Sequence, residues 1–120
     1  MALRAVRGAT RLSADDRAEM AEAVVELVGE MLARNGLTTD DLVSVIFTCT
    51  PDLVSDFPAA AARTLGLGDV PLLCAQEMAV PGALERVVRV MAHAETRHER
   101  SQVQHVYLRG AEVLRRDLAQ

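Results

Sequence analysis

One long helical segment stands beside about five largely apolar strand segments in this sequence, and that imbalance limits the folds open to the chain. The helix is expected to begin near Ser13 and Asp16, which have the spacing of a capping box, and to end at Asn35-Gly36. Glutamates fall mainly on one side of it, as an amphipathic helix requires. Its apolar stripe is predicted to contain Ala18, Ala21, Val25, Val28 and Leu32, widened by Val24 and Met31.

The rest of the chain is predicted to be mainly β-structure. Residues 42–49 are apolar or β-branched almost throughout, which favours a strand buried on both faces. A short helix over residues 58–65 follows, and it leads through a parallel crossover to the next strand. Residues 86–94 fit helix or strand by periodicity alone, and their valines favour a strand. Strands are expected at residues 2–10, 42–49, 70–74, 86–94 and 104–114, the last being a long one.

These elements predict one α+β domain over residues 1–120, with a mixed β-sheet of about five strands, one long helix and one short helix. Two such helices cannot cover both faces of so many apolar strands. The uncovered apolar surface would mark an interface, because large apolar patches are rare on monomeric proteins. We therefore expect a homo-oligomer, for which a closed ring is the commonest arrangement.

Composition argues against several classes of function. A net charge of −4 and a total of two Phe, one Tyr and no Trp do not suit a nucleic-acid surface. No stretch of about twenty apolar residues is available for a membrane span, and no apolar run near the N-terminus suggests a signal peptide. We expect a cytoplasmic protein that binds neither nucleic acid nor membrane. Cys49 and Cys74 should therefore stay reduced.

The usual catalytic motifs do not occur in the sequence. It has no Gly-rich phosphate loop, no nucleophile elbow and no zinc-binding helix motif. The histidines His93, His98 and His105 lack tight ligand spacing, so no metal site is predicted. Cys74 has no partner histidine nearby in the sequence, and we interpret it as a small structural thiol.

Charged residues inside apolar strands are the strongest functional signal. Arg89 shares a strand face with Val87 and Met91, and Arg7 lies among alanines. A buried guanidinium is costly unless it meets an anion, although at a sheet edge both side chains would extend to solvent. Together with Glu77 and Tyr107, these arginines would form a polar pocket suited to a small dicarboxylate.

Short sequence motifs along the whole chain together indicate one protein family. They are VRGAT (6–10), TPDL (50–53), FPA (57–59), AAR (61–63), CAQEM (74–78), RVM (89–91), HVYL (105–108) and VLRRDL (113–118). In this order and spacing they closely resemble the small monofunctional chorismate mutases of the trimeric pseudo-α/β-barrel type. The resemblance implies a homotrimer with active sites between subunits. It also implies conversion of chorismate to prephenate, a step of aromatic amino-acid biosynthesis.

Five residues would hold the substrate from one subunit, according to the resemblance. Arg7 and Tyr107 would bind a carboxylate, and Arg89 would bridge a carboxylate and the ether oxygen. Glu77 would hold the ring hydroxyl, helped by Cys74. The reaction is an intramolecular pericyclic rearrangement, so neither a metal nor a cofactor is expected.

Four further residues complete the site that the resemblance implies. Phe57, Ala59 and Arg63 would come from the neighbouring subunit and form the opposite wall. Arg115, near the C-terminus, would cover the entrance.

Two other functions remain open from the residues alone. One is a trimeric protein that binds an acidic metabolite without turnover. The other is an imine or enamine hydrolase of a similarly folded trimeric family, in which Glu77 would have to activate water. Prephenate formation, ammonia release or the absence of turnover distinguishes the three.

Overall fold

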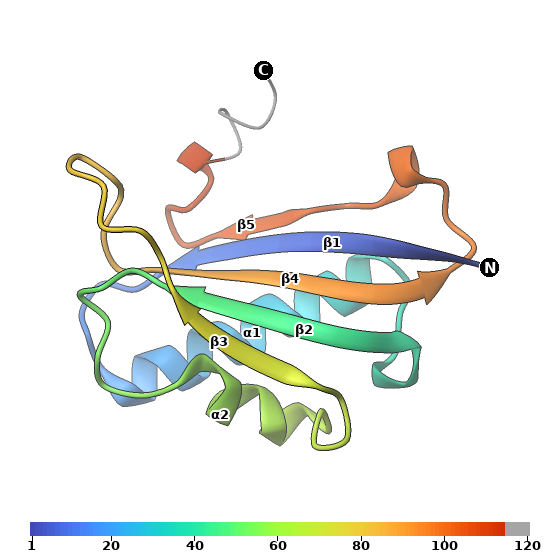
Figure 1. Ribbon diagram of the computed structural model, residues 1–120, viewed down its shortest axis with the longest axis horizontal. Helices are drawn as coiled ribbons and strands as arrows, with labels where there is room; N and C mark the ends of the chain where they lie inside the picture. Colours follow the sequence, from blue (N-terminus) through green and yellow to red (C-terminus); the bar gives the residue numbers. More distant parts are fainter. Residues whose placement is uncertain (115–120) are drawn as a thin grey trace.

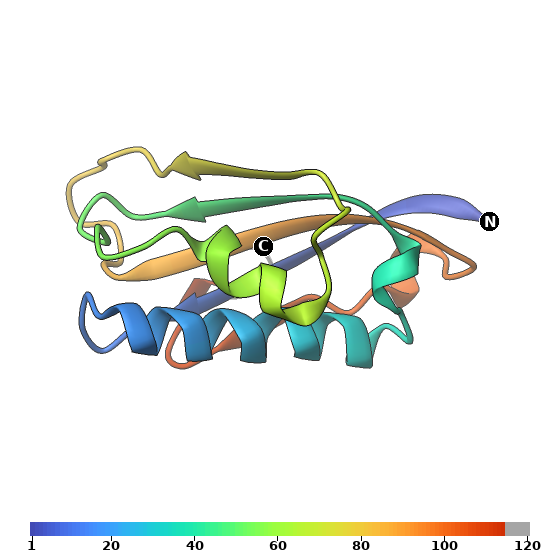
Figure 2. The ribbon, with the colours of Figure 1, turned by 90° about the horizontal axis from the view of Figure 1, so that it is seen from below.

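A computed structural model describes residues 1–114 as a mixed five-stranded sheet with α1 and α2 against one of its faces (Figures 1 and 2). Short 3₁₀ turns occur at Thr39–Asp41, Arg63–Leu65 and Arg100–Gln102. The main elements follow one another as β1 (Ala2–Arg11), α1 (Arg17–Arg34), β2 (Leu42–Cys49), α2 (Pro58–Ala62), β3 (Leu72–Gln76), β4 (Val87–Thr96) and β5 (Val106–Leu108). The predicted fold class, α+β with one long and one short helix, is confirmed.

The strands lie in the order β3-β2-β4-β1-β5. The central strand β4 is antiparallel to both of its neighbours, β1 and β2. β3 and β5 form the edges, and each is parallel to its one partner. The chain passes from β2 to β3 through α2, as the predicted crossover requires. Neither helix in the described part of the chain has the length and apolar character needed to span a bilayer.

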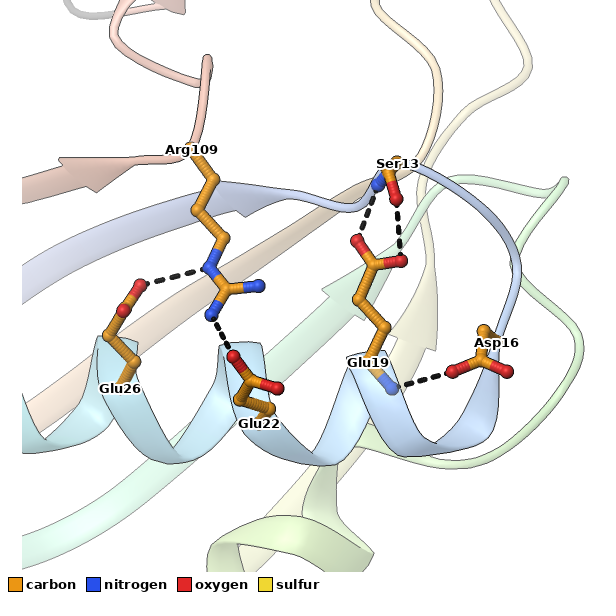
Figure 3. A network of polar contacts seen from close by, with 6 residues as sticks. All are labelled: Ser13, Asp16, Glu19, Glu22, Glu26 and Arg109. Carbon is orange, nitrogen blue, oxygen red and sulfur yellow. Dashed lines mark hydrogen bonds and ion pairs between the residues drawn. The ribbon is translucent and has the colours of Figure 1, made fainter.

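Local hydrogen bonds determine where α1 begins and ends. The N-cap is Asp16, whose carboxylate accepts a hydrogen bond from the Glu19 N–H at 2.8 Å (Figure 3). The Glu19 side chain reaches back to Ser13 and accepts from both its N–H and its hydroxyl. These bonds hold the pKa of Glu19 below its usual value. The helix ends at Asn35, and Gly36 takes the left-handed conformation with φ 62°. The predicted bounds are confirmed, with Asp16 in place of Ser13 as the cap.

The predicted apolar stripe of α1 is only partly confirmed: Val24, Val28 and Met31 are buried, but the other predicted residues are not. Ala18 is exposed, and Ala21, Val25 and Leu32 are only partly buried. The larger methionine and leucine side chains face the sheet because they bury more apolar area than the alanines. The buried face consists of Met20, Ala23, Val24, Leu27, Val28 and Met31.

The last strand is much shorter than predicted. β5 contains three residues, and its final residue Leu108 pairs with Thr10, close to the end of β1. Beyond that point the chain turns through left-handed conformations at Arg109, with φ 52°, and Gly110, with φ 91°. The predicted strand over residues 104–114 is therefore wrong, because β1 offers no partner for its second half.

Both α1 and α2 pack on one face of the sheet, and within residues 1–114 neither of them covers the other face (Figure 2). Leu3 on β1 is 57% exposed and Leu73 on β3 is 62% exposed. In β2, Val45 and Phe47 are buried while the alternating residues Ile46 and Thr48 are only partly buried, so this strand is not buried on both faces within one chain. We call the side of the sheet opposite α1 and α2 the open face. Its exposed apolar side chains confirm that two helices leave part of the sheet uncovered.

The close packing of α1 on β1 at Gly8 can be tested by adding a side chain at this position. A β-carbon at Gly8 would lie 2.5 Å from Met31 Sδ and 3.1 Å from Leu27 Cδ1. Gly8→Ala should therefore lower the free energy of unfolding by about 1–3 kcal/mol, measured by urea denaturation at fixed protein concentration.

Gly29 supplies the matched control, because a β-carbon there meets nothing within 4 Å and the residue lies inside α1. Gly29→Ala should raise the stability by about 0.5–1 kcal/mol through helix propensity. A Gly8→Ala protein as stable as Gly29→Ala would contradict this account of the packing.

Candidate active site

The register of the sheet brings three predicted site residues together on the open face. Ala9 of β1 pairs with Arg89 on β4 and with Tyr107 on β5. Arg7 lies two residues before Ala9, so its side chain is on the same face of β1. Arg7, Arg89 and Tyr107 line one cavity of about 190 Å³. The structure therefore assembles this part of the predicted site within a single chain.

Glu77 is held at the edge of this cavity. It follows β3 directly, and its N–H donates to the Cys49 carbonyl oxygen at 2.8 Å. Its Oε1 lies 3.2 Å from Arg89 Nε, and its Oε2 accepts a hydrogen bond from Thr48 Oγ1. The Arg89 side chain is 46% exposed and that of Glu77 22%. An ion pair between side chains this exposed contributes at most about 1 kcal/mol to stability. Stabilisation of the fold alone therefore does not explain the Arg89–Glu77 pair.

Thr48 was not among the predicted site residues. It pairs with Arg89 across β2 and β4 and lines the same cavity. The available signal was a hydroxyl inside an apolar strand, but the register that places it beside Arg89 is a long-range property. Thr48 orients the Glu77 carboxylate toward the guanidinium.

The charge of the cavity is positive. Within residues 1–114, no carboxylate lies within ion-pair distance of the Arg7 guanidinium. The backbone N–H of Arg7 donates to His105 Nδ1 at 2.9 Å, and this hydrogen bond links β1 to the residue just before β5. Among the described residues, two guanidinium groups thus line the cavity, and the Glu77 carboxylate pairs with the guanidinium of Arg89. Such a cavity favours an anionic ligand.

A second group of predicted residues lies elsewhere in the chain. Phe57 and Cys74 line a larger cavity of about 480 Å³ beside α2. Phe57 is 70% exposed, and Arg63 is exposed in the turn after α2. Ala59, by contrast, is buried in the chain's own core. The predicted residue Arg115 lies outside the described residues.

Cys74 is on the opposite side of the sheet from Arg89. It pairs with Phe47 and packs against the core, whereas the next residue, Ala75, pairs with Thr48 of the open face. Gln76 lines the larger cavity and the following Glu77 pairs with Arg89. The two cavities therefore flank the end of β3, and a single chain does not join their residues into one pocket.

Neither cysteine is disulfide-bonded, and one is poorly suited to nucleophilic chemistry. Burial raises the pKa of the Cys49 thiol to about 12, with smaller contributions from Cys74 and Glu77. A thiol with this pKa is almost entirely protonated near neutral pH.

Comparison with known proteins identifies the family. The family model for chorismate mutase type I matches residues 3–118. The chain belongs to this family. It is 47% identical to the chorismate mutase AroH of Thermus thermophilus over 117 residues. This match covers 97% of this chain and 96% of the relative. The chorismate mutase AroH of Bacillus subtilis strain 168 is 38% identical over 120 residues, covering 99% and 94%.

A solved structure agrees with the fold. The chain matches a chorismate mutase from Clostridium thermocellum with a TM-score of 0.89 and 45% sequence identity, over 91% of this chain and 97% of that one. The predicted family and the enzyme class, an isomerase, are confirmed. The alternatives of a non-catalytic binding protein and an imine hydrolase are not favoured.

The raised pKa of Cys49 predicts that its thiol reacts slowly in the native state of this type I chorismate mutase. At pH 8, iodoacetamide should modify Cys49 in the native protein at least about a hundredfold more slowly than in the urea-unfolded protein, because the thiolate is the reactive form. Mass spectrometry of tryptic peptides measures the modification. Comparable rates in the two states would show that burial does not suppress the thiolate.

Proposed function

We propose that this chain converts chorismate to prephenate at the cavity lined by Arg7, Arg89 and Tyr107, and that a neighbouring subunit of a homotrimer completes the site. The observation that carries the proposal is a pair of guanidinium groups, one of them beside a carboxylate, on the sheet face opposite α1 and α2 (Figure 2). Chorismate is a dicarboxylate, so it supplies the negative charge that this cavity lacks.

Arg89 supplies the main electrostatic catalysis in this proposal. As the C–O bond of the ether breaks, negative charge develops on its oxygen while the new C–C bond forms in the same molecule. A fixed guanidinium aimed at that oxygen binds the transition state more tightly than the ground state. The ion pair with Glu77 at 3.2 Å holds Arg89 in place before substrate binds. No proton transfer is needed, which suits a permanently charged group.

Arg7 and Tyr107 orient the substrate. The enolpyruvyl side chain of chorismate must fold over the ring before the reacting carbons can meet. Groups that bind its carboxylate impose this geometry and reduce the entropic part of the barrier. Glu77, which accepts from Thr48 and faces Arg89, is assigned to the ring hydroxyl, with Cys74 on the other side of the same strand end.

The opposite wall is assigned to the neighbouring subunit. Phe57 and Arg63 are exposed around α2 and lie apart from the Arg89 cavity in their own chain. The side chain of Ala59 packs in the core, so the contribution assigned to this residue is its backbone. Apolar residues exposed on the open face, such as Leu73, support contact with another copy. A closed trimer would bury them and join the two groups of residues.

Several expectations stay predictions within this proposal. Arg115 is assigned to the entrance of the site, a cofactor is not required by the chemistry, and residues 1–120 form one domain. The role in aromatic amino-acid biosynthesis follows from the reaction itself, and a cytoplasmic location is proposed with it.

Replacement of Arg89 tests the mechanism. Arg89→Ala should lower kcat by at least about 10²–10³-fold, the usual loss for one donor to a developing oxyanion. Arg89→Lys should restore little, because a point charge cannot serve the ether oxygen and a carboxylate together. Loss of chorismate absorbance measures the rate. As a control, Arg34→Ala removes an exposed guanidinium that pairs with Glu30 at the end of α1, and it should keep full activity. A fully active Arg89→Ala enzyme would contradict the mechanism.

Mixed oligomers test the shared site. Arg89→Ala and the double variant Phe57→Ala/Arg63→Ala should each be inactive alone. Co-expressed in equal amounts, the two chains should restore roughly a quarter of the normal activity, since half of the Arg89 sides and half of the opposite walls are intact. Native mass spectrometry verifies the mixing and the trimer. If verified mixed oligomers remain as inactive as their parents, each site lies within one chain.

A further inference from the structure

The turn that follows β5 has an unusual backbone. Arg109 has φ 52°, a left-handed conformation that arginine seldom adopts, and Gly110 follows with φ 91°. The Ala111 N–H closes the turn by donating to the Leu108 carbonyl oxygen at 3.0 Å. A strained residue of this kind persists only where its surroundings hold it in place.

The Arg109 side chain is bound at two points to α1. Its Nε lies 3.0 Å from Glu26 Oε1, and its Nη2 lies 3.0 Å from Glu22 Oε1 (Figure 3). Glu22 and Glu26 are four residues apart on one helix face, so they repel each other when unpaired. Hydrogen bonds to these carboxylates raise the pKa of Arg109. The Arg109 side chain thus connects the turn to the solvent-exposed face of α1. This helix packs on the side of the sheet opposite the open face (Figure 2).

Tyr107 and Ala111 lie on either side of this turn and pack together. Both are buried in a small cluster with Ala9 and Val87. β5 has three residues and pairs with β1 alone, so the sheet holds this strand only weakly. The position of Tyr107 in the cavity beside Arg7 therefore depends on the turn that follows it.

We propose that Arg109 is a positioning residue for the reaction: by binding Glu22 and Glu26 it fixes the turn that holds Tyr107 beside the substrate carboxylate. This inference rests on the proposed function, because it assumes the binding role of Tyr107. Arg109 itself does not line the cavity of Arg7 and Arg89. Its effect reaches the substrate through Tyr107.

The composition of the chain provides a specific probe for this inference. Tyr107 is the only tyrosine and the sequence has no tryptophan, so intrinsic tyrosine fluorescence reports on this one residue. Arg109→Gln removes the charge and both ion pairs. In this variant, quenching of the fluorescence by acrylamide should become stronger. KM for chorismate should rise by up to about tenfold, the change expected for a weakened hydrogen bond to substrate, with kcat changed less than about twofold.

Two further variants separate positioning from general stability. Arg34→Gln breaks the Arg34–Glu30 pair of the same helix and should change neither the quenching nor KM. The double variant Glu22→Gln/Glu26→Gln breaks the same contacts from the helix side and should reproduce Arg109→Gln. Combining all three substitutions should add nothing, because the contacts are already lost.

The inference is overturned if acrylamide quenching in Arg109→Gln and in the glutamate double variant equals that of the parent. It is also overturned if Arg34→Gln gives the same changes. Tyr107→Phe distinguishes the inference from the proposed function. If Tyr107→Phe leaves KM unchanged, the proposed role of Tyr107 is wrong and the inference falls with it. If Tyr107→Phe raises KM while Arg109→Gln does not, the proposed site stands and the positioning role of Arg109 is wrong.

Discussion

Packing of α1 against one face of the sheet is the interaction on which the rest of the structure depends. The helix buries its methionine, leucine and valine side chains against β1, and Gly8 lets it approach closely. α2 covers part of the same face (Figure 2). Since the hydrophobic cluster forms on that side, the opposite face keeps exposed leucines and is free to carry charge. The site is located there because arginine on the helix side would be desolvated without a partner.

Alternation along the strands then sorts the side chains by chemistry. In β4, Val88 and Val90 are buried while Arg89 between them lies on the open face. In β2, Phe47 is buried and Thr48 faces Arg89. Because the period of a strand is two residues, a shift of one residue in β4 would bury the arginine and expose the valines, and the same shift in β2 would bury Thr48 and expose Phe47. Packing of the core therefore also fixes the register of the site.

Local signals predicted most of the fold, whereas long-range pairing decided the features that were missed. Valine-rich runs located β2 and β4, and hydrogen-bonding residues located the ends of α1. The buried face of α1 was predicted only in part, with Val24, Val28 and Met31 correct, because alanines counted as much as methionines. The length of β5 depends on where β1 ends, and the contact between Thr48 and Glu77 depends on register. Arg7, Arg89 and Tyr107 line one cavity and Glu77 pairs with Arg89, whereas their roles in the site stay predictions from charge inside apolar strands and from the family resemblance. Phe57 and Arg63 lie apart from these residues in one chain, so their proposed part in the site depends on the proposed assembly.

The proposed assembly would strengthen electrostatic catalysis at Arg89. In one chain the Arg89 side chain is 46% exposed, so water screens its interaction with any developing negative charge. A second subunit packed on the open face would exclude that water and lower the local dielectric constant. The same contact would bury the leucines that a single chain leaves exposed. The exposed leucines and the cations that would benefit from a dry environment lie on one face of the sheet. In the proposed trimer, association of the subunits and formation of a competent site would therefore be the same event.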